Sequence, residues 1–138
     1  MVPAAFPQWT TDLLTGDREL DTHHRALFVK AQRLAVACSL GRGGEGIEVE
    51  LDWLRTYAQQ HFAAEDDRMT RFHYPYVETH RAAHRSFTAR LAGLEADLRT
   101  GADRGVVAAA AAAFVTDWFV THVRLVDMPL IEHLRRRC

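Results

Sequence analysis

Five histidines and two carboxylates in this chain have the types and spacing of metal ligands carried by helices. They are His24, His61 with Glu65, His80 with His84, and His122 with Asp127. Two of these pairs are spaced by four residues, so on a helix the members of each pair share one face. Apolar residues at helical spacing surround every block, and ionisable groups are costly in such stripes unless something binds them. The pattern predicts a buried metal site.

The types of the ligand residues limit which metals could bind. Imidazole with carboxylate suits transition metals such as iron, and the absence of paired cysteines argues against an Fe–S cluster or a cysteine-ligated zinc. The set is too large for one ion. With two bridging carboxylates and a bridging oxo or hydroxo group, it fills about eleven of roughly twelve positions on two six-coordinate ions. The remaining vacancy suits a small ligand such as O2, and its expected lining is Phe28, Phe62, Trp118 and Phe119.

The elements that must position these residues are helices. Apolar periodicity, bounded by glycines and prolines, predicts helices over about 18–40, 47–71 and 76–99 and a fourth from about Val106. An irregular arm, 1–17, precedes them, and a short helical segment ends the chain. Four amphipathic helices with short connections predict an all-α, up-down-up-down four-helix bundle formed by a single domain, 1–138. The ferritin-like bundle is the alternative, but its Glu-x-x-His pairs do not occur here.

Three histidines outside the predicted set are assigned by position. The apolar stripe of the first helix centres on His24, which leaves His23 at its edge. His73 precedes a turn and His133 adjoins arginines, so we expect both to be solvated. The stripe of the fourth helix extends to Leu125.

Asp127 requires a local irregularity in the fourth helix. It follows His122 by five residues, which on a regular helix is a rotation of roughly 140°. Pro129 disfavours helix at the preceding residue, so we expect the helix to unwind or bend there and return the carboxylate toward the imidazole.

Bulk composition excludes several partners. A net charge of -1 gives no reason to expect nucleic acid or anionic lipid. The longest apolar run, 106–115, is too short to cross a membrane, and no signal peptide is visible. Cys38 and Cys138 have no disulfide or C-x-x-C pattern. We expect a cytoplasmic protein with reduced thiols, monomeric by default because no apolar stripe is left over for a large interface.

The ordered set of motifs resembles the hemerythrin family, in particular its single-domain bacterial members, the bacteriohemerythrins. The resemblance covers nearly the whole chain. Its motifs are Trp9, the segment Leu20-Asp21-Thr22-His23-His24-Arg25-Ala26-Leu27-Phe28, His61-Phe62-Ala63-Ala64-Glu65, Met69, Tyr74-Pro75, His80-Arg81-Ala82-Ala83-His84, Trp118-Phe119-Val120-Thr121-His122 and Asp127.

The resemblance implies a non-haem di-iron centre. It assigns His80, His84 and His122 to one iron and His24 and His61 to the other. Glu65 and Asp127 would bridge the irons together with a solvent-derived oxygen. It further implies reversible binding of O2, as hydroperoxide, at the iron with fewer ligands, with no catalytic residues and a role as oxygen carrier, store or buffer.

Two positions depart from the family pattern. A glutamine commonly stands where this chain has His23, and leucine is frequent where it has Phe119. The extra imidazole would lie near the mouth of the site, and the larger ring would narrow the oxygen pocket.

Three alternative functions are weighed beside oxygen binding. One is an oxygen or redox sensor that acts through a separate, unidentified protein partner. Another is a di-iron oxidase or a peroxide- or nitric-oxide-consuming enzyme, for which the sequence offers no second catalytic group beyond His23. The third is a structural zinc site.

Overall fold

The computed structural model describes residues 9–137, so Cys138 and part of the predicted arm, 1–8, lie outside the described residues. The order of elements is η1 (Thr11–Leu13), α1 (Arg18–Ser39), α2 (Ile47–Arg71), α3 (Val77–Arg99), α4 (Arg104–His122), the π-helical turn η2 (Val123–Asp127) and α5 (Met128–Arg137). No strand occurs among these residues. The all-α fold predicted from apolar periodicity is confirmed.

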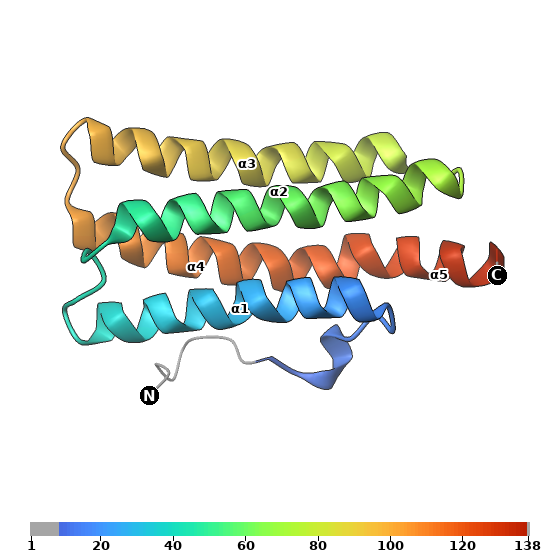
Figure 1. Ribbon diagram of the computed structural model, residues 1–138, viewed down its shortest axis with the longest axis horizontal. Coiled ribbons are helices and arrows are strands. Elements are labelled where there is room, and N and C mark those ends of the chain that lie inside the picture. The colour runs from blue at the N-terminus through green and yellow to red at the C-terminus, as the bar shows by residue number, and fades with distance from the viewer. Residues whose placement is uncertain (1–8, 138) are drawn as a thin grey trace.

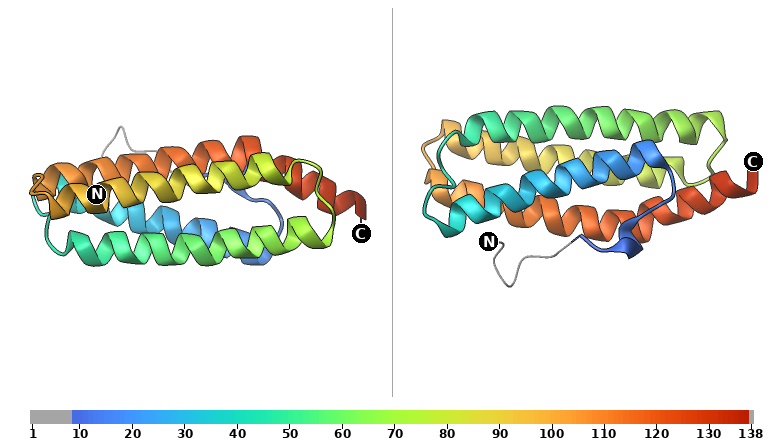
Figure 2. Two further views of the ribbon diagram at one scale, coloured as in Figure 1. Left: turned by 90° about the horizontal axis from the view of Figure 1, so that it is seen from above. Right: turned by 60° about the horizontal axis from the view of Figure 1, so that its bottom comes forward.

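The four long helices form a bundle of antiparallel neighbours. Helix α1 packs against α2 and α4, and α3 packs against the same two helices from the other side (Figures 1 and 2). Helix α5 continues the direction of α4 past the end of the bundle (Figure 1). This is the up-down-up-down order expected from four amphipathic helices with short connections.

Local sequence explains where the helices begin and end. The Asp17 side chain caps α1 by accepting a hydrogen bond from the Leu20 amide, and Asp103 caps α4 through the Val106 amide at 3.0 Å. The Asp103 cap starts α4 two residues before the predicted Val106. At the far end of α1, Gly41 has a φ of 72°, a conformation in which glycine has no Cβ penalty.

The apolar core is divided into two clusters, one toward each end of the bundle. The larger cluster fills the end formed by the second half of α1, the first half of α2, the second half of α3 and the first half of α4. Ala108, Ala111 and Ala112 belong to it, and such small side chains let α1 and α4 approach closely. The smaller cluster consists of Met69, Tyr74 and Leu130. The predicted metal ligands lie between the two.

The stretch from Arg104 to Arg136 is 33 residues long and apolar enough, by length and composition, to cross a membrane. It exceeds the ten-residue run considered from sequence because helix continues through η2 and α5. Half of its apolar window is buried inside the bundle. The same stretch brings His122 and Asp127 into the interior, so its apolar character is that of a core helix.

Two side chains lie where the sequence did not place them. Leu125 is 70% exposed, not part of the buried stripe, because the π-helical turn changes the rotation per residue. His133 is not simply solvated: its Nε2 donates a hydrogen bond of 2.8 Å to the carbonyl oxygen of Phe72, at the end of α2. His73 is exposed, as expected.

Candidate metal centre

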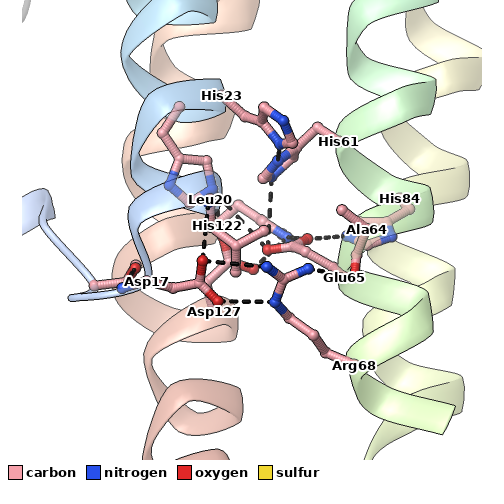
Figure 3. Close-up of polar contacts among 12 residues, drawn as sticks. Asp17, Leu20, His23, His61, Ala64, Glu65, Arg68, His84, His122 and Asp127 are labelled. Atoms are coloured by element: carbon pink, nitrogen blue, oxygen red, sulfur yellow. Dashed lines mark hydrogen bonds and ion pairs between the residues drawn. The ribbon is translucent and has the colours of Figure 1, made fainter. Parts of the chain in front are cut away.

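The structure brings the seven predicted ligands together in the interior of the bundle. None of the seven is more than 7% exposed. Two overlapping groups have their ligand atoms within 4.8 Å of one another: Glu65 with His80, His84 and His122, and Glu65 with His24, His61 and Asp127. Every long helix contributes, and Glu65 belongs to both groups (Figure 3). The arrangement can hold two metal ions side by side.

The two oxygen atoms of Glu65 face different groups of histidines. Oε1 faces the Nε2 atoms of three residues, at 3.2 Å from His80, 2.9 Å from His84 and 3.8 Å from His122. Oε2 faces the other pair, at 3.6 Å from His61 and 4.0 Å from His24. A carboxylate placed in this way can bridge two ions.

Asp127 divides its oxygens in the same manner. Oδ1 lies 3.0 Å from His122 Nε2 and 3.2 Å from His80 Nε2, whereas Oδ2 lies 3.1 Å from His24 Nε2. The predicted irregularity near Asp127 is confirmed, but its form differs from the expectation. The chain does not unwind at Pro129, since Met128 keeps helical angles of -59° and -42°.

A π-helical turn supplies the required rotation instead. The Met128 amide bonds to the Val123 carbonyl, five residues back. In such a turn, residues five apart come close to alignment, as residues four apart do in an α-helix. This turn therefore places the side chains of His122 and Asp127 on one face.

The hydrogen-bonding state of the buried atoms shows that the donor set fits metal ions. Among the described residues, several buried ligand atoms have no hydrogen-bond partner, namely Nε2 of His24, His61 and His122, Oε2 of Glu65 and both carboxylate oxygens of Asp127. Some of these atoms lie about 3 Å apart without hydrogen-bond geometry. Within each group the ligand atoms lie no more than 4.8 Å from one another. Buried polar groups are rarely left unpaired, and two cations would satisfy them.

In the absence of metal, the charges of the site are strongly coupled. Burial favours neutral His122, but Asp127 and Glu65 outweigh it and raise the pKa of this histidine to about 9. Burial lowers the pKa of His61 to about 3. Burial also opposes ionisation of Glu65, yet the nearby His61 and His122 and the hydrogen bonds from His80 and His84 hold the pKa of this carboxyl well below its usual value. The metal-free site is therefore a mixture of imidazolium, imidazole and carboxylate.

His23 contacts the centre indirectly. Its Nδ1 lies 3.0 Å from Nδ1 of His61, whose Nε2 faces Glu65 (Figure 3). If His61 offers the Nε2 lone pair to a metal, its Nδ1 carries the proton and donates it to His23 Nδ1. Burial lowers the pKa of His23, which favours the neutral imidazole that such acceptance requires. Sequence placed this residue only near the mouth of the site.

Aromatic rings cover the histidines. Phe62 stacks on His84 with ring centroids 3.9 Å apart, and Trp118 stacks on His122 at 4.2 Å. Phe119 lies about 6 Å from both His24 and His61. Phe62 also lies 5.8 Å from His61. Of the four residues expected to line a small-ligand pocket, Phe119 and Phe62 are thus beside the two-histidine group. Phe28 is buried and packs edge-on against Trp9, at 5.6 Å.

A clamp that the sequence analysis did not identify ties α1 to α2 beside the centre. Arg68 Nε lies 2.8 Å from Oδ2 of Asp17, and Arg68 Nη2 lies 2.9 Å from Oε1 of Glu19. Arg68 also donates to the Ala64 carbonyl at 2.9 Å. The clamp fixes the start of α1, about two turns before His24, against the turn of α2 that carries Glu65.

A four-helix bundle with two buried, histidine-rich groups sharing a carboxylate has the fold and the donor set of a metal-binding helical bundle. The comparisons with known proteins agree, since residues 15–134 match the family described as the hemerythrin HHE cation binding domain. The chain belongs to the hemerythrin family.

Curated relatives in bacteria and an animal are similar over most of the chain. A bacteriohemerythrin of Methylococcus capsulatus is 29% identical over 89% of this chain and 92% of its own length. A bacteriohemerythrin of Stenotrophomonas maltophilia is 27% identical over 92% of this chain and 80% of its own. A hemerythrin from Sipunculus nudus is 28% identical over 91% of both chains. The family predicted from the ordered motifs is confirmed.

Proposed function

We propose that the centre holds two iron ions and that the protein binds dioxygen reversibly, as an oxygen carrier, store or buffer. The observation that carries this proposal is the pair of four-residue groups that share Glu65. Five imidazoles and two carboxylates match the ligand preferences of iron. When bound, the iron pair would supply the two electrons that reversible oxygen binding requires.

The ligand assignment follows from the two groups. His80, His84 and His122 would hold one ion, and His24 and His61 the other. Glu65 and Asp127 would bridge them, with a solvent-derived oxo or hydroxo group as a third bridge. The ion with two histidines would keep the open position. Phe119 lies about 6 Å, between ring centroids, from His24 and His61, and together with Phe28, Phe62 and Trp118 it would keep the ligand in apolar surroundings.

The protein's own residues would exclude competing chemistry. Rings close over the imidazoles, so water and larger substrates have little access. His23 is the one candidate acid or base that the sequence analysis named beside the centre, and its contact with His61 gives it a supporting role, which favours binding over turnover. We further propose that residues 1–138 act as one domain, as a monomer in the cytoplasm, where Cys38 would stay reduced.

The test is to reduce the purified protein anaerobically, count metals per chain, and record absorption while O2 is added and removed. We expect two irons per chain and a charge-transfer band that appears with O2 and disappears when O2 is removed. Consumption of O2 or peroxide without such a band would favour an enzyme. Zinc in place of iron, with no spectral response, would indicate a structural site.

A further inference from the structure

A continuous series of ring contacts leads from the surface to the metal centre. Trp53 stacks on Tyr57 with centroids 4.7 Å apart and planes at 13°. Tyr57 meets His23 edge-on at 5.7 Å, and His23 meets His61 at 5.2 Å as well as through the Nδ1 contact of 3.0 Å. Trp53, Tyr57 and His23 are all partly exposed, whereas His61 is fully buried. The series crosses from solvent to a proposed iron ligand without a gap.

The outer end of this series opens into a basic groove. The groove has a volume of about 550 Å³ and is lined in part by Trp53, Arg25, Lys30 and Arg33. Lys30 Nζ lies 5.0 Å from the Trp53 ring centroid and 2.9 Å from Oε2 of Glu50. Arg25 and Arg33 are exposed, and neither forms an ion pair with any residue in 9–137. Two cations that residues 9–137 leave unpaired therefore flank the outermost ring.

We propose that this groove docks an acidic one-electron carrier protein and that Trp53, Tyr57 and His23 conduct its electrons to the metal centre. The proposal rests on the proposed function, because it requires iron at the centre. An iron pair that had lost two electrons to O2 would be diferric and could no longer bind O2. Two reduced carriers, each losing one electron, would return that pair to the ferrous state.

Charge and ring placement favour this direction and this class of partner. Complementary charge accelerates encounter and orients the partner, and electron-transfer complexes are typically small and weak. The Lys30 cation beside Trp53 disfavours an oxidised indole ring, so electrons would tunnel inward across the rings without leaving a tryptophan radical. The rate of electron tunnelling falls exponentially with distance, so the loss of one ring contact should slow electron transfer.

A second series of rings provides the matched control. Phe114 stacks on Phe87 at 5.4 Å, Phe87 meets Trp118 at 4.8 Å, and Trp118 stacks on His122. Its outer ring is partly buried, like Tyr57, and has Arg90 over it at 6.0 Å. The basic groove does not adjoin it. Replacing Phe114 therefore removes an aromatic ring from the protein without changing the rings through which electrons are proposed to enter.

The first experiment follows reduction of the ferric, iron-loaded protein by a reduced, acidic [2Fe–2S] ferredoxin in an anaerobic stopped-flow instrument. We expect Tyr57→Leu to slow reduction at least severalfold, Tyr57→Phe to keep the rate, and Phe114→Leu to leave it unchanged. Iron per chain and the O2-dependent band are checked in every variant. Equal rates in Tyr57→Leu and the parent, or slowing in Phe114→Leu alone, would overturn the route.

The second experiment tests docking independently of oxygen binding. The ¹⁵N-labelled full chain, as purified, is titrated with oxidised ferredoxin, and we expect shifts at the Trp53 indole and along residues 25–33. The Arg25→Gln/Arg33→Gln pair should remove these shifts and slow ferredoxin reduction about tenfold at low salt, with the difference vanishing at high salt. It should not slow reduction by the methyl viologen radical cation. Absence of shifts would overturn the docking surface, and this result can be read even if the chain binds no iron.

Discussion

The Nε2 atom of His122 and the Oδ1 atom of Asp127 lie 3.0 Å apart, although five positions separate the two residues. The π-helical turn between them makes this contact possible. The same turn moves Leu125 to the surface. One local deviation thus completes the centre and changes the outer face of the helix.

Replacing Asp127 with asparagine removes the charge while keeping the shape of the side chain. An amide cannot bridge two ions as a carboxylate does, and the counter-charge of His122 is lost as well. We expect iron to fall from two per chain to one or none, measured by metal analysis after gel filtration. Asp117→Asn, at an exposed position of α4, serves as the control. Full retention of iron by Asp127→Asn would contradict the bridging role.

Removing the His23 imidazole deprives His61 of its hydrogen-bond acceptor. Loss of such an outer partner typically costs about 10–100-fold in metal affinity, and we expect a cost of that order for His23→Ala. His23→Gln should recover much of it, because an amide carbonyl also accepts a hydrogen bond. Iron transfer to a competing chelator measures the affinity, with exposed His73→Ala as the reference. If His23→Ala holds iron as tightly as the parent, the contact has no supporting role.

The stability of the metal-free protein should fall as the pH rises above neutrality. The pKa of His122 is raised to about 9 in the fold, against about 6.5 in an unfolded chain. Its contribution, on the order of 3 kcal/mol, is present below pH 6.5 and is lost as pH rises through 9. Iron binding requires neutral His122, so the loaded protein should not show this loss. Thermal unfolding of both forms between pH 6.5 and 9.5 provides the comparison, and parallel curves would contradict the assignment.

Exchanging Phe119 for leucine should speed the entry of O2. The ring lies about 6 Å from His24 and His61 and is 2% exposed. A smaller side chain opens space beside the proposed binding position, at a cost of roughly 1 kcal/mol in unfolding free energy. Association rates and autoxidation rates are measured by stopped-flow absorption and compared with those of Phe114→Leu, whose ring packs on Phe87. Unchanged rates would show that Phe119 does not control access.

Much of the fold and the composition of the centre follow from local patterns. The glycines after the helices predicted where the helices end, whereas the caps Asp17 and Asp103, which set the starts of α1 and α4, were identified only in the structure. The placement of the ligands inside the bundle follows from their position within apolar stripes. Each of the predicted features belongs to a single helix, so residue spacing along the sequence is enough to predict it.

Contacts between side chains on different helices could not be predicted from the sequence. The contact of His23 with His61 joins residues 38 positions apart, and the clamp of Arg68 on Asp17 joins residues 51 apart. Both depend on how far α1 slides along α2, which no single-helix pattern specifies. The bond from His133 to Phe72 has the same origin. At Asp127 the need for a deviation could be predicted, but not its form, because an unwound turn and a widened turn both return the carboxylate to the centre.

The layer of ligands interrupts the hydrophobic core and leaves Met69, Tyr74 and Leu130 as the buried members of the small cluster beyond it. Leu13, Leu20 and Ile131 are also buried toward this end but belong to neither cluster. The apolar packing there is therefore less continuous than in the large cluster, and local opening takes place where such contacts are sparse. Bound iron would therefore hold the helices together at that end of the bundle. In the metal-free protein, the end with the large cluster would stay closed and the other end would open locally more often. The iron supply would then control the rigidity of the protein as well as the amount of O2 that it binds.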